Sequence, residues 1–146
     1  TIATVVGARP QFIKAGPVSR AFKDTGVSEI LIHTGQHFDD AMSAVFFEQM
    51  GLAEPDHHLG ISGGGHGDMT GRMLIALEPV LEEEQPDGLL IYGDTNSTLA
   101  GALAAVAVTA LAVAPVGLAG AQSTGATPVL ILYAWTGDIG GEYRIL

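Results

Sequence analysis

The chain has 146 residues, of which 47% are hydrophobic and only 15% charged. This length and composition suit one globular domain with a buried core and exclude a disordered chain. The net charge of −10 at pH 7 argues against a nucleic-acid partner, because an acidic surface repels phosphate backbones. The lack of cysteine excludes disulfides, the opening residues predict no secretory signal, and a cytoplasmic location is therefore expected.

Short apolar runs alternate with helix-length segments. The pattern predicts strands at 2–6, 30–32, 88–92, 113–116 and 128–133, and helices at about 11–24, 39–50, 69–84 and 97–109. The run Gly88–Tyr92 is apolar apart from its first and last residues, which is typical of a parallel strand covered on both faces. This alternation predicts a single α/β domain with an open, doubly wound, mainly parallel sheet, which is a Rossmann-like fold.

The last third of the chain is almost free of charge. No charged residue occurs from Asn96 to Gly137. A membrane span of about 20 apolar residues is one interpretation, and a buried helix followed by a buried strand is the other. The segment is rich in Ala, Gly and Thr, is interrupted by Pro115 and has no Lys or Arg flank, which favours the buried helix and strand. No membrane partner is expected.

Polar residues follow three of the predicted strands. Arg9 comes after the first, His33–His37 after the second, and Gly93–Asn96 after the strand at 88–92. In open parallel sheets the carboxyl ends of the strands meet at one edge, and ligands bind there. The three segments are therefore expected to form one ligand-binding edge.

These segments resemble the motifs of the non-hydrolysing UDP-N-acetylglucosamine 2-epimerases. Gly7–Lys14, which reads GARPQFIK, is similar to the first βα turn of that family, where Gly-Thr-Arg-Pro-Glu is usual. Ala8 and Gln11 depart from that pattern. His33–His37 (HTGQH) matches the second loop, and Tyr92–Thr98 (YGDTNST) matches the third and is the most specific of the three. The resemblance implies one half of a GT-B-type architecture.

The family chemistry implied by the resemblance is inversion at C2 of UDP-N-acetylglucosamine or a related nucleotide sugar. UDP is eliminated and then added back, without a redox cofactor. Asp94 matches the catalytic carboxylate, although it could instead cap a helix. Arg9 and Lys14 match substrate contacts at a helix N-terminus, where an anion is favoured, although both could be solvated surface charges.

Other residues are implied as substrate contacts with less distinctive patterns. They are Gln36, His37, His66, Arg72, Thr95 and Asn96. Gln36 and His37 could instead bind a regulatory nucleotide, and His66 and Arg72, together with Ser62, could make allosteric contacts. A histidine in a turn could equally be solvated or a capping donor. The glycine-rich segment 63–67 lacks the P-loop lysine and follows no strand, so it predicts a mobile loop. His57 and His58 are adjacent and do not share a helix face, so no metal site and no cofactor are expected.

The resemblance covers about residues 2–106 and fails over 107–146. Where the family has a His-Val-Glu-Ala-Gly-Leu-Arg-Ser loop, residues 116–123 read VGLAGAQS and lack the Glu and the Arg. We also expect the second domain of the family to be absent. We expect a truncated, frame-damaged or engineered epimerase half that is inactive alone and self-associates through the exposed interdomain face. The alternatives are a non-catalytic nucleotide-sugar-binding module and half of a GT-B-type glycosyltransferase.

Overall fold

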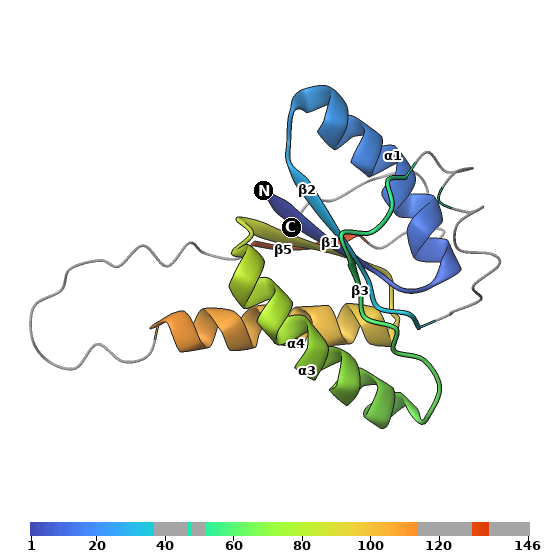
Figure 1. Ribbon diagram of the computed structural model, residues 1–146, viewed down its shortest axis with the longest axis vertical. Helices are drawn as coiled ribbons and strands as arrows, with labels where there is room; N and C mark the ends of the chain where they lie inside the picture. Colours follow the sequence, from blue (N-terminus) through green and yellow to red (C-terminus); the bar gives the residue numbers. More distant parts are fainter. Residues whose placement is uncertain (37–46, 48–51, 114–129, 135–146) are drawn as a thin grey trace, which may run out of the picture.

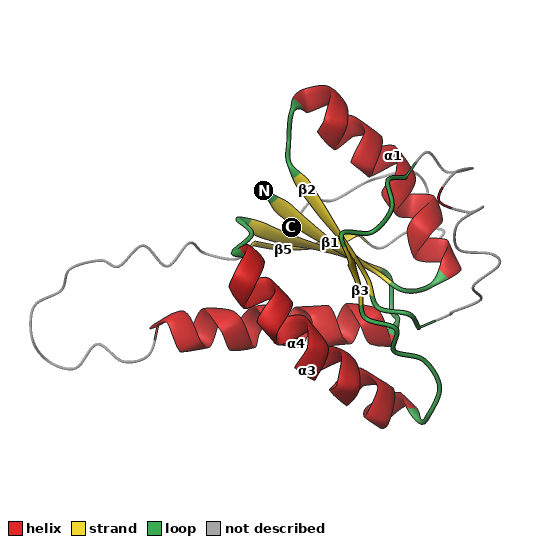
Figure 2. Cartoon of the chain, in the orientation of Figure 1, coloured by secondary structure: helices red, strands yellow, loops and turns green. Residues whose placement is uncertain are grey.

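The computed structural model describes residues 1–36, 47, 52–113 and 130–134. In chain order the elements are β1 (Ile2–Val6), α1 (Arg9–Thr25), β2 (Glu29–His33), β3 (His57–His58), α3 (His66–Glu84), β4 (Gly88–Tyr92), α4 (Asn96–Val113) and β5 (Leu130–Ala134). The strands form one sheet, with α1 on one side and α3 and α4 on the other (Figure 1 and Figure 2).

The sheet is parallel throughout, and its strand order is β3-β2-β1-β4-β5. From β1 the chain moves outward through β2 to β3, then returns to the other side of β1 with β4 and continues to β5. The order therefore reverses between β1 and β4, which is where sheets of this kind bind their ligands. The predicted doubly wound, parallel α/β fold is confirmed.

Most element bounds agree with the sequence pattern, and the differences have local causes. β1 and β4 have the predicted bounds, whereas α3 begins three residues early because its first turn is polar and leaves no apolar period. The strand predicted at 113–116 is wrong at Val113, which continues the apolar helix α4. The helix predicted at 39–50 lies outside the described residues, apart from Phe47. β3 was not predicted, because two histidines form no apolar run.

Side chains alternate between two cores along each central strand. The core under α3 and α4 takes Ala3 and Val5 of β1, Ile32 of β2, and Leu89 and Ile91 of β4. The core under α1 takes Val6, Leu31, Leu90 and Tyr92 together with Phe12 of the helix. This is the two-residue period of a strand that is covered on both faces. Each fully buried aliphatic or aromatic side chain contributes about 1.5–3 kcal/mol of transfer free energy, so this burial stabilises the central strands.

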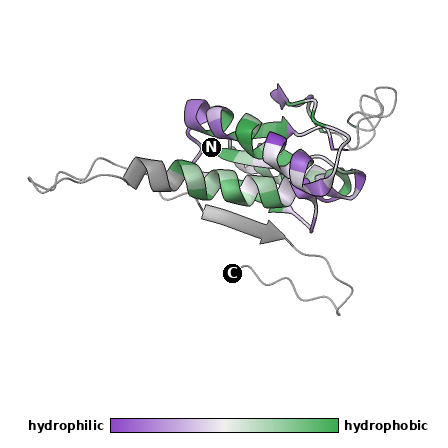
Figure 3. Ribbon diagram, turned by 90° about the horizontal axis from the view of Figure 1, so that it is seen from below, coloured by the Kyte–Doolittle hydropathy of each residue, from purple (hydrophilic) through white to green (hydrophobic). Residues whose placement is uncertain are grey.

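Helix α4 explains part of the uncharged segment. The side that packs on the sheet consists of small residues, namely Ala100, Gly101, Ala104 and Ala105. A Cβ on Gly101 would lie 3.0 Å from Ile91 Cγ2, so the helix approaches β4 closely. The opposite side exposes Leu99, Leu103 and Val106, so the part of α4 whose burial is described, residues 96–108, has a buried side and an exposed side. Figure 3 shows that α4 is largely apolar along this part. Within the described residues, no helix is both long and apolar enough to cross a membrane.

A buried histidine lies at the end of β2. The ring of Phe12 stacks on His33 with centroids 5.2 Å apart, and the ring of His58 lies 4.4 Å away on centroids. His33 is completely buried, and neither ring nitrogen has a hydrogen-bond partner within the described part of the chain. Burial, with a smaller effect of the neighbouring His58, lowers the pKa of His33 to about 4. The imidazole is therefore neutral at pH 7.

Acid is expected to destabilise the fold through this histidine. His33 takes up a proton near pH 6.5 when unfolded but only near pH 4 when folded, so stability present above pH 6.5 is lost as the pH falls. The loss amounts to roughly 3 kcal/mol by pH 4. Urea unfolding at pH 7 and pH 4.5 measures it. His33→Phe should reduce the difference, and His66→Phe, at an exposed position, should not. An unchanged difference in His33→Phe would contradict this assignment.

Candidate functional site

The carboxyl ends of β1 and β4 lead through short turns directly into α1 and α4 (Figure 1). α1 begins at Arg9 and has Pro10 in its first turn, where the missing N–H costs nothing and the fixed φ suits a helix. Gly93 follows β4 with a φ of 70°, a left-handed conformation that glycine adopts without strain. Two helix N-termini therefore meet at the edge where the strand order reverses.

A buried glutamine joins the two turns. Gln11 is 2% exposed, and its Oε1 accepts hydrogen bonds from the backbone N–H groups of Gly7 at 2.7 Å and Ala8 at 2.9 Å. Its Nε2 donates to the carbonyl oxygen of Tyr92 at 2.7 Å and to Thr95 Oγ1 at 2.8 Å. Since backbone N–H groups only donate and carbonyls only accept, these partners determine the orientation of the amide. One side chain thus connects the turn after β1 to the turn after β4.

Thr95 caps helix α4. Its Oγ1 accepts a hydrogen bond from the backbone N–H of Thr98 at 3.3 Å, the position an N-cap side chain normally satisfies. Thr98 in turn donates its hydroxyl to the carbonyl oxygen of Tyr92 at 2.5 Å. Asp94, one residue before the cap, is exposed. The capping role that the sequence left open for Asp94 is therefore filled by Thr95, and the carboxylate stays at the surface of this edge.

Gln36 links the segment after β2 to the start of α4. Its Oε1 accepts hydrogen bonds from the backbone N–H of Ser97 at 3.1 Å and from Ser97 Oγ at 2.7 Å. Thr34 Oγ1 lies 2.8 Å from the same Ser97 hydroxyl. Gly7 passes so close that a Cβ there would overlap Thr34 Oγ1 and Ser97 Oγ. Gln36 thus reaches the predicted edge, and its amide oxygen accepts one of the backbone N–H groups at the N-terminus of α4.

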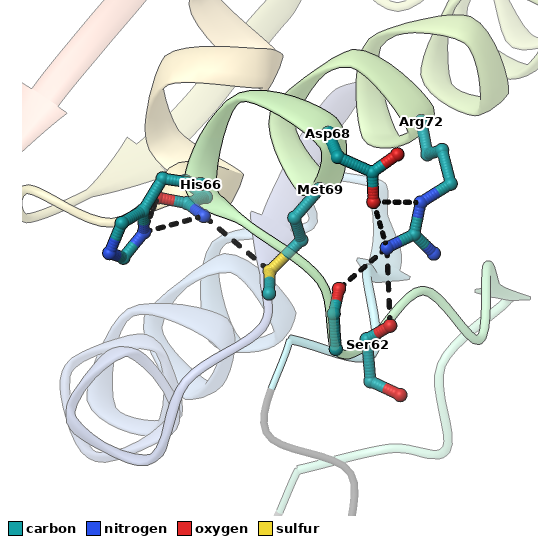
Figure 4. Close-up of polar contacts among 7 residues, drawn as sticks. Ser62, His66, Asp68, Met69 and Arg72 are labelled. Carbon is teal, nitrogen blue, oxygen red and sulfur yellow. Dashed lines mark hydrogen bonds and ion pairs between the residues drawn. The ribbon is translucent and has the colours of Figure 1, made fainter.

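His66 and Asn96 meet where α3 and α4 begin. His66 Nδ1 lies 3.3 Å from Asn96 Oδ1 and 3.2 Å from Asn96 Nδ2. Asn96 Nδ2 also lies 3.5 Å from the sulfur of Met69. Figure 4 shows His66 and Met69 on the first turn of α3. His66 is exposed and Asn96 is half-buried. The structure therefore brings these two predicted ligand contacts together.

Arg72 holds the glycine-rich loop against α3. Its guanidinium pairs with Asp68 at 2.8 Å, one helical turn away, and donates to the carbonyl oxygens of Ser62 at 3.3 Å and Gly63 at 2.6 Å (Figure 4). An exposed pair of this kind adds little stability by itself. Two hydrogen bonds thus join the loop to α3, and the guanidinium already has protein partners.

The remaining predicted contacts lie on α1 or outside the described residues. Arg9 is exposed at the first residue of α1, directly at the edge of the sheet. Lys14 is half-buried five residues further along, and that spacing turns it about 140° around the helix from Arg9. The two cations therefore point in different directions. His37 lies outside the described residues.

Sequence reasoning missed the residues that hold this edge together. Gln11 was noted only as a departure from a motif, and Thr34 and Ser97 were not singled out. A signal for Gln11 exists, because it is the third residue of a helix, where Glu or Gln commonly reaches back to the N-cap backbone. Thr34 and Ser97 have no comparable local signal, since 63 positions separate them in the sequence.

A parallel sheet whose order reverses between two helix-bearing turns, with polar side chains in both turns, defines a Rossmann-like domain. Comparison with known proteins identifies the family within this class. Residues 20–114 match the family model described as UDP-N-acetylglucosamine 2-epimerase. The chain belongs to the UDP-N-acetylglucosamine 2-epimerase family.

Individual relatives agree with this assignment. UDP-2,3-diacetamido-2,3-dideoxy-D-glucuronate 2-epimerase from Pseudomonas aeruginosa is 61% identical over 105 residues, covering 71% of this chain and 30% of the relative. A UDP-N-acetylglucosamine 2-epimerase homolog from Methanococcus maripaludis is 52% identical, covering 70% of this chain and 29% of the relative. The chain thus spans about 30% of the length of these relatives.

Solved structures are similar over the same part of the chain. The crystal structure of Methanocaldococcus jannaschii UDP-GlcNAc 2-epimerase in complex with UDP-GlcNAc and UDP has a TM-score of 0.70 at 42% identity, covering 77% of this chain and 30% of that one. The Neisseria meningitidis UDP-GlcNAc 2-epimerase bound to UDP-GlcNAc has a TM-score of 0.64 at 30% identity, covering 71% and 28%. These matches support epimerase ancestry over the glycosyltransferase alternative.

Gly7→Ala should disrupt this site. The new methyl group would overlap the hydroxyls of Thr34 and Ser97, and we expect a loss of about 3 kcal/mol in the free energy of unfolding. Gly71→Ala is the matched control, because a Cβ there meets nothing within 4 Å and alanine favours a helix. Urea unfolding of both variants checks this, and equal stability of the two would contradict the tight packing at Gly7.

Proposed function

We propose that this chain forms the part of a 2-epimerase that holds a UDP-linked 2-acetamido sugar at the edge where β1 and β4 end. The observation that carries the proposal is the placement of Arg9 and Asp94 directly after these two strands, at the reversal of strand order. Ligands of open parallel sheets bind at that point. Membership of the epimerase family supplies the reaction.

The proposed reaction has two steps, the elimination of UDP from the sugar and its addition back. The C2 proton is removed and the bond from C1 to the UDP oxygen breaks, which leaves a glycal. UDP then adds back to C1 as C2 is protonated on the opposite face. Asp94 is the proposed acid/base group, because an exposed carboxylate at the ligand edge can take up and return a proton.

The diphosphate is proposed to bind cationic side chains more than backbone amides. The N–H groups of Gly7 and Ala8 already donate to Gln11 Oε1, so they are occupied in this arrangement. Arg9, exposed at the first residue of α1, offers a planar charged donor beside the positive end of the helix. Thr95 and Asn96 border the same edge and are proposed to contact the sugar, as are Gln36 and His66.

Two substrates fit this proposal. Solved relatives contain UDP-GlcNAc, which favours it as the general substrate of the family. The 61% identical relative is named for UDP-2,3-diacetamido-2,3-dideoxy-D-glucuronate, which favours that sugar as the second candidate. The two differ at C3 and at C6, where the second carries an acetamido group and a carboxylate. Competition between them for the chain therefore discriminates the candidates.

We propose that residues 1–146 bind the nucleotide sugar without completing the inversion. The support comes from residues 116–123, which read VGLAGAQS where the family motif carries a Glu and an Arg. Stabilisation of the departing diphosphate and one proton-transfer group are then missing from that segment. Loss of a single such group typically costs about 10²–10⁴-fold in rate.

Proton NMR of the chain with UDP-GlcNAc in D₂O tests this proposal. Saturation transfer from protein to the uridine and sugar protons is expected, with no deuterium at C2 and no manno epimer. Absence of saturation transfer would contradict the binding site.

Asp94→Asn, with Asp24→Asn as the matched control at the far end of α1, assigns any turnover that appears. Deuterium entry that Asp94→Asn abolishes and Asp24→Asn retains would overturn the inactivity of the chain and support the role of Asp94. Deuterium entry that survives in Asp94→Asn would instead remove Asp94 from the reaction.

A further inference from the structure

Gln11 meets two demands that few side chains can meet together. Its Oε1 must accept two N–H groups from the turn after β1, and its Nε2 must donate to the carbonyl oxygen of Tyr92 at the end of β4. The same Nε2 donates to Thr95 Oγ1 at 2.8 Å, and Thr98 Oγ1 lies 3.2 Å from it. Breaking such a network leaves several buried polar groups unpaired, at about 1–3 kcal/mol each.

The partners of Gln11 lie immediately around the proposed reacting groups. Gly7 and Ala8 precede Arg9, and Tyr92 and Thr95 enclose the two-residue turn that carries Asp94. The distance between the cation of one turn and the carboxylate of the other therefore depends on the amide that connects them. Displacements of about 1 Å at positions of this kind are enough to change rates and affinities strongly.

We propose that Gln11 is a positioning residue, whose carboxamide sets the Asp94 turn relative to Arg9 for binding of the nucleotide sugar. The identity of the ligand in this inference rests on the proposed function. The geometry rests on the hydrogen bonds of Gln11 alone. Gln11 itself is buried beneath the edge and acts through the two turns.

The chemistry of the network makes one substitution informative. Gln11→Glu restores the Glu that is usual in the family motif, but without the Thr that usually accompanies it at position 8. In this variant, one carboxyl oxygen can still accept from Gly7 and Ala8, whereas the other would face the Tyr92 carbonyl oxygen at the distance where Nε2 now donates. Only a protonated carboxyl can donate there. Burial and the facing carbonyl raise the pKa of such a group, while the two N–H donors oppose the shift. The Gln11→Glu variant should therefore hold the Asp94 turn in place at low pH, and this positioning should be lost as the pH rises.

The other ionisable groups on the elements around position 11 are the same in the variant and in the wild type. They are Arg9 and Lys14 on α1, Glu29 and His33 on β2, Tyr92 on β4 and Asp94 in the turn; the described part of α4 has none. UDP titrates too. The ratio of variant to wild-type affinity at each pH removes all these contributions, and only the group at position 11 differs.

The experiment measures UDP affinity by calorimetry at pH 5, 6, 7 and 8, below the unfolding temperature of each protein. Gln11→Glu should bind within about twofold of wild type at pH 5 and about tenfold or more weakly at pH 8. Gln11→Met, which lacks both hydrogen-bonding functions, should bind weakly at every pH. Gln85→Glu adds the same charge at an exposed position and should keep a constant ratio near one.

Backbone amide resonances of residues 94–96, recorded without ligand, separate this inference from the proposed function. In Gln11→Glu they should approach wild-type positions at pH 5 and depart from them at pH 8. Changed melting temperatures with unchanged affinity per folded molecule and unchanged resonances would overturn the positioning role. If wild type does not bind UDP, the proposed function fails, and the resonances alone decide whether Gln11 positions the turn.

Discussion

Two parallel strands that end side by side leave backbone donors and acceptors that need partners at the edge of the sheet. After β1 and β4 the buried carboxamide of Gln11 supplies these partners, because it accepts from the N–H groups of Gly7 and Ala8 and donates to the carbonyl oxygen of Tyr92. The helices α1 and α4 start from these turns, so their N-termini are held at one place. The edge that is proposed to bind the ligand thus follows from the way the backbone groups at the ends of β1 and β4 are hydrogen-bonded.

The neighbouring contacts extend the same arrangement outward. Gln36 and Thr34, from the segment after β2, reach Ser97 at the start of α4. The first turn of α3 reaches α4 through His66 and Asn96. Together with Gln11, which donates to Thr95, these contacts join three segments of the chain to the N-terminus of α4. A polar side chain at this edge can serve the scaffold and a ligand at once, because open parallel sheets bind their ligands at such an edge.

The sequence was sufficient for the parallel sheet and for the edge, because both follow from local periodicity and from the position of turns after strands. β1 and β4 were predicted to the residue, since apolar runs bounded by turn residues have few alternatives. The division of work between Asp94 and Thr95 could not be predicted, because either residue type can cap a helix. The connection of the two turns by Gln11 could not be predicted either, because it depends on a contact between residues 81 positions apart in the sequence.

The central claim is that the edge formed by the turns after β1 and β4 binds the nucleotide. Its most direct test is a titration of the ¹⁵N-labelled chain with UDP, following backbone amide shifts residue by residue. The account predicts that the shifts cluster at Arg9 and at residues 93–97, and that Arg9→Met weakens them while Arg20→Met, further along α1, does not. Shifts confined to other parts of the described chain, or an equal effect of the two arginine variants, would contradict it.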